Sequence, residues 1–548
     1  MKPLSLLGIT AIALAACTPT RSTPAPAPAP APSPAPNPTT PPSRVLKEAP
    51  RDWQLLDVDA DTVIGIGLER AMRDLLASKQ PQRTVVVAVI DGGVDTAHVD
   101  LRANLWMNED EVPGNGRDDD GNGYVDDVRG WNFIGGADGE NVRYDTFEVT
   151  RLFARCRLAN PDSVPADLRA RCPEISADYD RKRGEAERTL MAVQQISRIL
   201  LPAAETLRKA LGDDSLNVAN VTAMQPSSGD VRRARETYLQ MAGRGISPEM
   251  VVDAHEAYES QLRYGYNTDY DPRSIVGDDY SDVTERIYGN PDVTGPDAEH
   301  GTHVAGIIAA VRGNGVGIDG IAPSVRIMGV RAVPDGDERD KDVANAIRYA
   351  VDNGAHVINM SFGKAYSPRK DAVDEAVRYA ESKGVLLVHA AGNDGEDLEK
   401  KPNFPTPRLD SNTVARNWIT VGASSWKGLD SLAAPFSNYG NEEVDVFAPG
   451  VDILSTIPGG EYERNSGTSM AAPVVTGLAA LLMSYYPSLT ATDVRRIIME
   501  SAAPYRAQMV VVPGGDTRAA FGTLSVTGGI VNVPAAVRMA EEMTGATP

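Results

Sequence analysis

Four apolar runs rich in β-branched residues have the length of buried strands: 84–90, 325–330, 357–360 and 385–389. Such runs, with no regular alternation of polar positions, are typical of strands covered on both faces. Apolar residues recur at helical spacing before and between them: 65–79, 303–311, 343–353 and 371–383. Strands that alternate with helices predict an α/β fold, a mostly parallel, doubly wound sheet with helices on both faces.

Residues 138–288 interrupt this alternation. They contain no comparable strand run, but they include two long amphipathic patterns, 176–211 and 228–264. We interpret the segment as a helical-hairpin insertion between two strands of the main fold. Restricting access to a site, capping a site and binding a partner or regulator are all roles open to such an insertion.

The N-terminal residues 1–17 have the pattern of an export signal. One charge, at Lys2, precedes an apolar run that is shorter than the about 20 residues needed to span a bilayer. The run ends in LAAC at Cys17, which resembles the lipobox of bacterial lipoproteins and implies that Cys17 is lipidated. An ordinary secretory signal cleaved nearby is the alternative. Thr18 is not the aspartate associated with inner-membrane retention, so we expect the outer membrane in a Gram-negative host, or an extracellular location without the lipid.

Residues 18–43 form a low-complexity linker with eleven prolines among 26 residues, mostly alternating with alanine. Such a sequence supports neither a sheet ladder nor a helix interior, so we expect polyproline II. At about 3.1 Å per residue it would extend roughly 80 Å from a membrane. A semi-rigid stalk is a simpler interpretation than a recognition motif for a proline-binding partner.

Charge and cysteine content exclude some classes of protein. Of 548 residues, 75 are acidic and 54 basic, so the net charge is −21. A nucleic-acid-binding protein would instead present a basic surface. Three cysteines are too few for a disulfide-dense scaffold. Cys156 and Cys172 both fall in the insertion, and in an exported protein such a pair is more often a disulfide than a metal site.

Three short segments carry residue types suited to nucleophilic catalysis. Asp91 ends the first strand run in VIDGGVD, His300 begins HGTHVAG, and Ser469 lies in GTSMAAP before an apolar helical pattern. A serine hydroxyl is a weak nucleophile near pH 7 and needs an imidazole that takes its proton. The imidazole in turn needs a carboxylate that fixes its tautomer and stabilises the cation.

Asn393, in AAGNDG directly after a strand run, is a further candidate. Its amide and the backbone N–H of Ser469 can donate to a developing oxyanion, and one such donor is typically worth about 3–4 kcal/mol of barrier. Each residue alone also has a structural interpretation: Asp91 as a cap or turn residue, Ser469 as a helix N-cap, and Asn393 as a turn residue. The occurrence of all these segments in one order favours catalysis.

Together these segments resemble the subtilisin-like serine proteases, or subtilases, whose catalytic residues follow in the order Asp, His, Ser. The resemblance implies that Asp91 orients His300, that His300 is the general base and then the acid, and that Ser469 is the nucleophile. It also implies an oxyanion hole formed by Asn393 and the N–H of Ser469.

The resemblance extends to a substrate-binding segment of three residues, Ser361, Phe362 and Gly363. In the family, this strand lines the specificity pocket and pairs its backbone with the substrate by strand addition. His303 lies one helical turn after His300, and we expect it to be packed rather than catalytic.

The chain departs from the family's pattern in two ways. Small subtilases separate the catalytic Asp and His by a few dozen residues, whereas here 209 positions separate Asp91 from His300. Subtilases are usually made with an N-terminal chaperone domain, but the N-terminal extension 44–83 is only about half the usual length. We therefore expect a peptidase domain over 84–545 and no autocatalytic maturation of the usual form.

The segment DDDGNGYVDD at 118–127 is a candidate calcium loop, with oxygen ligands at its positions 1, 3, 5 and 9. The expected ligands are the side chains of Asp118, Asp120, Asn122 and Asp126 and the carbonyl of Tyr124. Arg129 stands where an EF-hand has its bidentate Glu, so the loop is not an EF-hand. A solvated acidic loop is the alternative; related subtilases carry stabilising calcium, which favours binding.

The sequence thus predicts a serine endopeptidase, tethered to the cell envelope, that cleaves protein or peptide substrates through an acyl-enzyme. Calcium is expected as a structural cofactor, with none needed for the chemistry. The alternative is a catalytically inactive binding lipoprotein on a protease scaffold. A dead scaffold tends to lose catalytic positions, and all four are present here.

Overall fold

A computed structural model of the chain describes residues 46, 48–158, 164–212 and 216–545. The expected signal peptide with Cys17 and the linker 18–43 lie outside the described residues. At the centre is a nine-stranded sheet in the order β10-β13-β7-β6-β5-β4-β1-β3-β2, with β10 and β13 as its antiparallel pair. Its strands are β1 (Val85–Asp91), β2 (Gly130–Asn132), β3 (Val325–Arg331), β4 (Val357–Met360), β5 (Leu386–Ala390), β6 (Trp418–Ser424), β7 (Val446–Pro449), β10 (Ala503–Pro504) and β13 (Gly529–Ile530).

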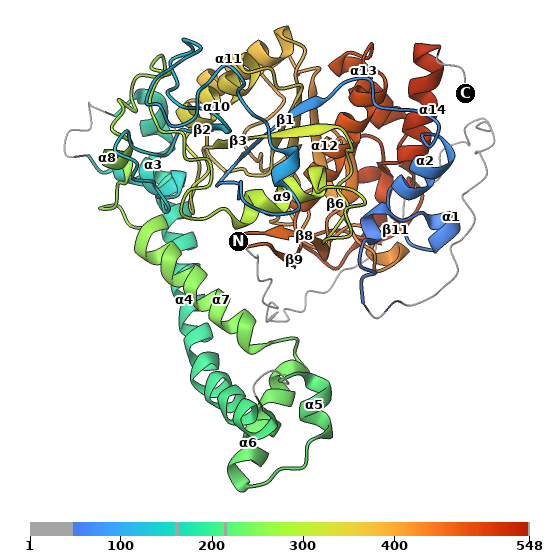
Figure 1. The fold of residues 1–548 in the computed structure, drawn as a ribbon. Coiled ribbons are helices and arrows are strands. Elements are labelled where there is room, and N and C mark those ends of the chain that lie inside the picture. The colour runs from blue at the N-terminus through green and yellow to red at the C-terminus, as the bar shows by residue number, and fades with distance from the viewer. Residues whose placement is uncertain (1–45, 47, 159–163, 213–215, 546–548) are drawn as a thin grey trace, which may run out of the picture.

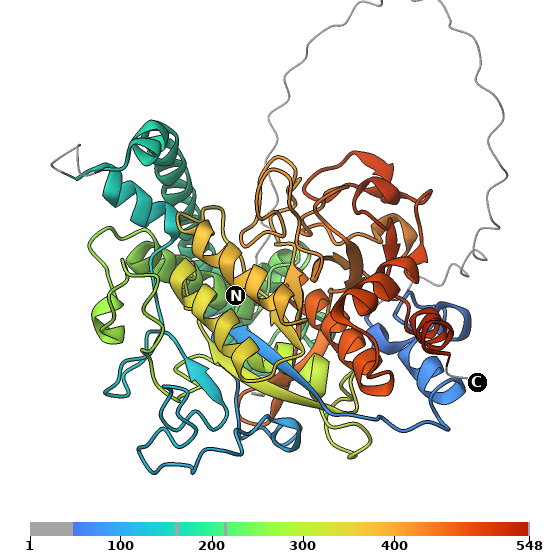
Figure 2. The same cartoon turned by 90° about the horizontal axis from the view of Figure 1, so that it is seen from above.

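Helices cover both faces of this sheet (Figure 1 and Figure 2). Side chains of a strand point to alternate faces, and in β1 the valines Val85, Val87 and Val89 enter one core while Ala88 and Ile90 enter the other. The first core is covered by α2 (Leu68–Asp74), α9 (Glu299–Ala309), α12 (Thr468–Tyr485), α13 (Ala491–Glu500) and α14 (Val533–Thr544). The second is covered by α10 (Asp340–Asp352) and α11 (Lys370–Ser382). The predicted α/β class is confirmed.

The helix α12 is largely apolar, and its position in the fold accounts for this. Among the described residues it is the one helix whose length and apolar composition would suit a membrane span, but 94% of it is buried inside the protein. It runs along the sheet and contacts β1, β4, β5, β6 and β7. Its apolar composition therefore reflects burial in the protein core.

The insertion forms an arm that projects from the body (Figure 1). Its helices are α3 (Glu148–Cys156), α4 (Ala166–Leu211), α5 (Val218–Ala223), α6 (Gly229–Ala242) and α7 (Pro248–Ser260), which continues as the π-turn η5 (Gln261–Gly265). The long helix α4 packs against both α6 and α7. Cys156 and Cys172 form a disulfide that joins α3 to α4 at the base of the arm.

The helices of the arm differ from the two that the sequence predicted. The first begins ten residues earlier than predicted, at Ala166, and continues through Pro173. The second is not continuous, because the chain turns between α6 and α7. Ser247 caps α7 by accepting a hydrogen bond from Met250 N, and Pro248 occupies its first turn. Proline has no N–H to donate, so it begins a helix more readily than it continues one.

Short elements complete the fold. They are η1 (Trp53–Leu55), α1 (Val58–Asp61), η2 (Arg102–Asn104), α8 (Arg273–Val276), η6 (Leu429–Ser431), η7 (Phe521–Thr523), and the hairpins β8 (Ile453–Ile457) with β9 (Glu461–Asn465) and β11 (Met509–Val511) with β12 (Arg518–Ala520).

Candidate active site

Asp91 and His300 form a hydrogen-bonded pair at the carboxyl end of β1. Asp91 is the last residue of that strand and His300 the second residue of α9. Both Asp91 carboxylate oxygens lie close to His300 Nδ1, at 2.8 and 2.9 Å. The Asp91 side chain is 3% exposed, whereas that of His300 is 34% exposed. A buried carboxylate that accepts the Nδ1 proton favours the tautomer whose accessible Nε2 can accept a proton.

Ser469 is the second residue of α12, a helix that packs against both α9 and β1. Its hydroxyl donates to the carbonyl of Ser361 at 3.1 Å. Within the described part of the chain, no hydrogen bond joins it to His300. Catalytic hydrogen bonds often form only when substrate is bound, so this geometry is compatible with a serine that turns towards the imidazole.

The side-chain carbonyl of Asn393 is turned towards the start of α12. Its Oδ1 accepts hydrogen bonds from the backbone N–H of Thr468 at 2.8 Å and from the Thr468 hydroxyl at 3.0 Å. This network fixes the orientation of the amide and leaves the Nδ2 hydrogens available. Because α12 begins at Thr468, the N–H of Ser469 is one of the first-turn donors without a partner inside the helix. Asn393 and Ser469 thus offer two hydrogen-bond donors.

The predicted substrate-binding segment follows β4 and is hydrogen-bonded to the start of α12. The Ser361 hydroxyl donates to the Ser469 carbonyl at 3.0 Å, and the Phe362 carbonyl lies 2.8 Å from Nε2 of His389. Burial lowers the pKa of His389 to about 4, so the ring is neutral and can donate through Nε2. A Cβ at Gly363 would lie 2.4 Å from the side-chain amide of Asn403, so a larger residue here would have to displace that amide.

The model of the subtilase family matches residues 82–528. The chain belongs to the subtilase family. It is 46% identical to the thermophilic serine proteinase of Bacillus sp. (strain AK1) over 217 residues, which is 39% of this chain and 48% of that protein. It is 39% identical to subtilisin E of Bacillus subtilis (strain 168) over 211 residues, which is 38% of this chain and 51% of that protein. The match therefore spans about half the length of these curated relatives.

His303 of this subtilase is packed, as expected. It is 0% exposed, and its Nε2 lies 3.0 Å from the Glu463 carbonyl on β9. Burial lowers its pKa to about 4. A neutral ring with no access to solvent has no route to take part in proton transfer with a substrate.

The acidic loop of the subtilase groups a different set of carboxylates from the predicted calcium ligands. Oxygens of Glu111, Asp120 and Asp127 all lie within 4.8 Å of one another. Glu111 and Asp127 are buried, and burial raises the pKa of Asp127 to about 6. The group offers only oxygen ligands, the donor type that Ca²⁺ prefers. The loop's chemistry therefore fits the ion.

The other predicted ligands make hydrogen bonds within the loop. Asp118 accepts hydrogen bonds from the backbone N–H groups of 121–123. Asp126 accepts those of 115–116, and Asn122 donates its amide to the cluster carboxylates at 3.0 and 3.1 Å. The ring of Tyr124 packs in the second core. Spacing within the loop could not reveal Glu111, which lies before the motif.

Sequence reasoning also missed a buried group of charges beside the substrate-binding segment. The Lys364 side chain is 2% exposed, and its Nζ lies 3.1 Å from Glu148 of α3 and 2.9 Å from Asp340 of α10. Burial alone would lower the pKa of Lys364, but these carboxylates and Glu338 raise it, so the ammonium stays charged. The ion pair with Glu148 therefore joins α3, at the base of the insertion, to Lys364, the residue directly after Gly363.

Replacing Lys364 by methionine is expected to lower the free energy of unfolding by about 3–5 kcal/mol, because it leaves buried carboxylates without their counter-charge. Urea unfolding followed by circular dichroism measures this. Lys400→Met is the control, since Lys400 pairs with Asp397 on the surface and is 78% exposed; its stability should match the wild type. Equal stability of both variants would contradict the prediction.

Proposed function

We propose that this subtilase is a serine endopeptidase that hydrolyses peptide bonds of protein or peptide substrates through an acyl-enzyme. The proposal rests above all on the buried carboxylate–imidazole pair of Asp91 and His300. Ser469 lies on α12, which packs against the same strand, β1. Family membership adds support, since the relatives that the chain resembles are named as proteases.

In the acylation step, the Ser469 hydroxyl turns from the Ser361 carbonyl to Nε2 of His300 and loses its proton as it attacks the substrate carbonyl. The oxyanion receives hydrogen bonds from Asn393 Nδ2 and the N–H of Ser469. His300 then protonates the leaving amine. Asp91 stays ionised and stabilises the imidazolium. Water, activated by the same imidazole, releases the acyl group.

We propose that the substrate binds as an added strand along 361–363. In this segment the carbonyls of Ser361 and Phe362 already accept internal hydrogen bonds. Gly363 has no backbone hydrogen bond within the described part of the chain, although its neighbour Lys364 pairs with Phe404 in both directions. The N–H and C=O of Gly363 are therefore available to a substrate.

A fluorophosphonate probe tests the proposed function, because it phosphonylates only an activated serine. Labelling of the folded, calcium-loaded protein that disappears in Ser469→Ala is the expected result. Absence of labelling in the folded wild type would favour the second candidate, a catalytically inactive binding lipoprotein. Digestion of a panel of unstructured proteins would then separate a general protease from an enzyme that processes one partner.

We further propose that a lipid on Cys17 tethers the enzyme to the cell envelope, with the linker 18–43 as a stalk, and that the arm receives a partner or regulator. The proposal for the anchor rests on the sequence pattern alone. Incorporation of labelled palmitate into the wild type and not into Cys17→Ala would support it. Equal fractionation of both proteins as soluble, unlabelled species would refute it.

We propose that calcium binds the acidic loop at Glu111, Asp120 and Asp127 and contributes stability, not chemistry. Saturating Ca²⁺ is expected to raise the free energy of unfolding by about 2.7 kcal/mol at a hundredfold excess over Kd. Thermal unfolding with calcium or with chelator measures the effect. Glu111→Gln should abolish it, whereas Asp118→Asn, which alters a carboxylate used by the loop backbone, should retain most of it. The reverse result would restore the ligand set predicted from sequence.

A further inference from the structure

The segment that precedes the region matched by the family model is built into the core of the protein. Trp53, Ile66 and Leu68 are 0–1% exposed and belong to the same core cluster as β1 and α12. The backbone carbonyl of Ile66 accepts a hydrogen bond from Val533 N at 2.9 Å, at the start of α14. Removing this segment would open the main core to solvent.

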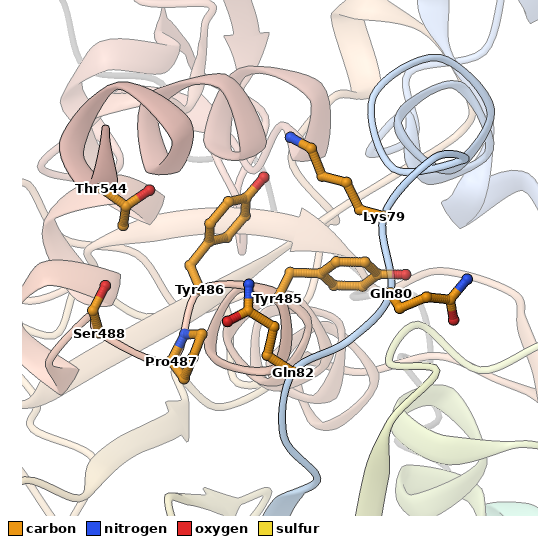
Figure 3. Close-up of a pocket in the computed structure, with 8 residues that line it drawn as sticks. All are labelled: Lys79, Gln80, Gln82, Tyr485, Tyr486, Pro487, Ser488 and Thr544. Carbon is orange, nitrogen blue, oxygen red and sulfur yellow. The ribbon is translucent and has the colours of Figure 1, made fainter. Parts of the chain in front are cut away.

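The end of the extension is anchored as well. Gln82 N donates to the Ser484 carbonyl at 2.8 Å, near the C-terminal end of α12. Lys79 pairs with Glu541 of α14. Figure 3 shows Lys79, Gln80 and Gln82 passing over Tyr485 and Tyr486, where they border a cavity of about 470 Å³.

The junction between the extension and β1 lies far from the nucleophile. Ser484 follows Ser469 by fifteen positions on the same helix, and a helix rises about 1.5 Å per residue. The junction is therefore about 22 Å along α12 from Ser469. In this fold, Ser469 cannot reach the junction of its own chain.

Trp53 connects the extension to the segment in front of the nucleophile. Its Nε1 donates to the Val451 carbonyl at 2.9 Å in a buried environment. The preceding residue, Gly450, accepts a hydrogen bond from Gly467 N at 2.8 Å. Gly467 is the N-cap of α12, two residues before Ser469. Two hydrogen bonds and the adjacent residues 450 and 451 thus connect the indole of Trp53 to Gly467, at the start of the helix that carries Ser469.

We infer that residues 51–83 are a permanent part of the mature enzyme, not a removable pro-segment, and that Trp53 is a positioning residue for the 450–467 contact beneath Ser469. The extension then performs a structural task inside the active protein. The kinetic readouts rest on the proposed function, whereas the mass of the folded protein reports on retention even if no activity is found.

Intact mass and N-terminal sequencing of the mature, folded protein test the retention. The expected N-terminus lies before Arg51, in the wild type and in Ser469→Ala alike. A folded mature form that begins anywhere after Arg51 would overturn the inference. When the fluorophosphonate labels the wild type, the same measurement is made on the labelled species.

Trp53→Phe tests the positioning role, because it keeps an aromatic ring and removes the N–H donor. We expect kcat to fall about fivefold, the rate equivalent of one ordinary hydrogen bond, with KM and Tm close to wild type. Trp131→Phe is the matched control: Trp131 donates a buried indole hydrogen bond to Tyr288 on the far edge of the sheet, so kcat should not change. Equal kcat in Trp53→Phe and the wild type would overturn the role of Trp53.

Discussion

Replacing Ser469 by alanine is expected to lower kcat for peptide hydrolysis by about 10⁶-fold, the magnitude typical of removing a nucleophile from a unit that acts together. The substitution removes the hydroxyl oxygen that we propose as the nucleophile. KM and Tm should change little, because the Ser469 hydroxyl makes one side-chain hydrogen bond, to Ser361, and is partly exposed. Steady-state kinetics on a chromogenic peptide, with thermal unfolding alongside, measure both effects.

Ser488→Ala is the control for this variant, since Ser488 is an exposed serine just beyond the other end of α12. It should keep full activity and full labelling by the fluorophosphonate. Hydrolysis by purified Ser469→Ala at more than a hundredth of the wild-type rate would mean that another group is the nucleophile, and the assignment of Ser469 would have to be abandoned.

Four of the central strands could be predicted because both of their faces are buried. In β1, β3, β4 and β5, most positions are buried and apolar, so the sequence shows apolar runs without regular alternation. The central strands β6 and β7 are also buried at every position but were not predicted. The sheet-edge strands β2, β10 and β13 have only two or three residues and give no such signal. The hairpin strand β9 is mostly polar and partly exposed. Its extended conformation comes from backbone pairing with β8 and not from burial of its side chains, so it leaves no apolar run in the sequence.

The site was predictable where a chemical group follows a strong element along the chain. Asp91 and Asn393 each come at or just after the end of a buried strand, and parallel strands bring such ends to one edge of the sheet. Contacts between distant segments gave no such signal. Lys364 meets Glu148 across 216 positions, and Trp53 meets Val451 across 398 positions. Only the folded chain reveals such pairs, since neither partner lies in a recognisable motif.

Replacing Asp91 by asparagine is expected to lower kcat by about 10⁴-fold at neutral pH, with KM little changed. The Asn amide would present N–H groups to His300 Nδ1, which then has to accept instead of donate. The proton of the neutral ring would move to Nε2, the atom that must take the Ser469 proton. The imidazolium would also lose its buried counter-charge. Measurement of kcat against pH and of the rate of fluorophosphonate labelling, which should slow without being abolished, tests this.

Asp95→Asn is the matched control, because Asp95 lies in the same segment but uses its carboxylate to accept backbone N–H groups of Ala97 and Gly459. It should lower kcat only slightly. If Asp91→Asn kept activity within tenfold of the wild type, the carboxylate would not control the tautomer of His300. The short contacts of 2.8 and 2.9 Å at Nδ1 would then be structural. A large loss in Asp91→Asn with a small one in Asp95→Asn would show that the carboxylate of Asp91 does control the tautomer, since both changes remove one negative charge from the same short segment.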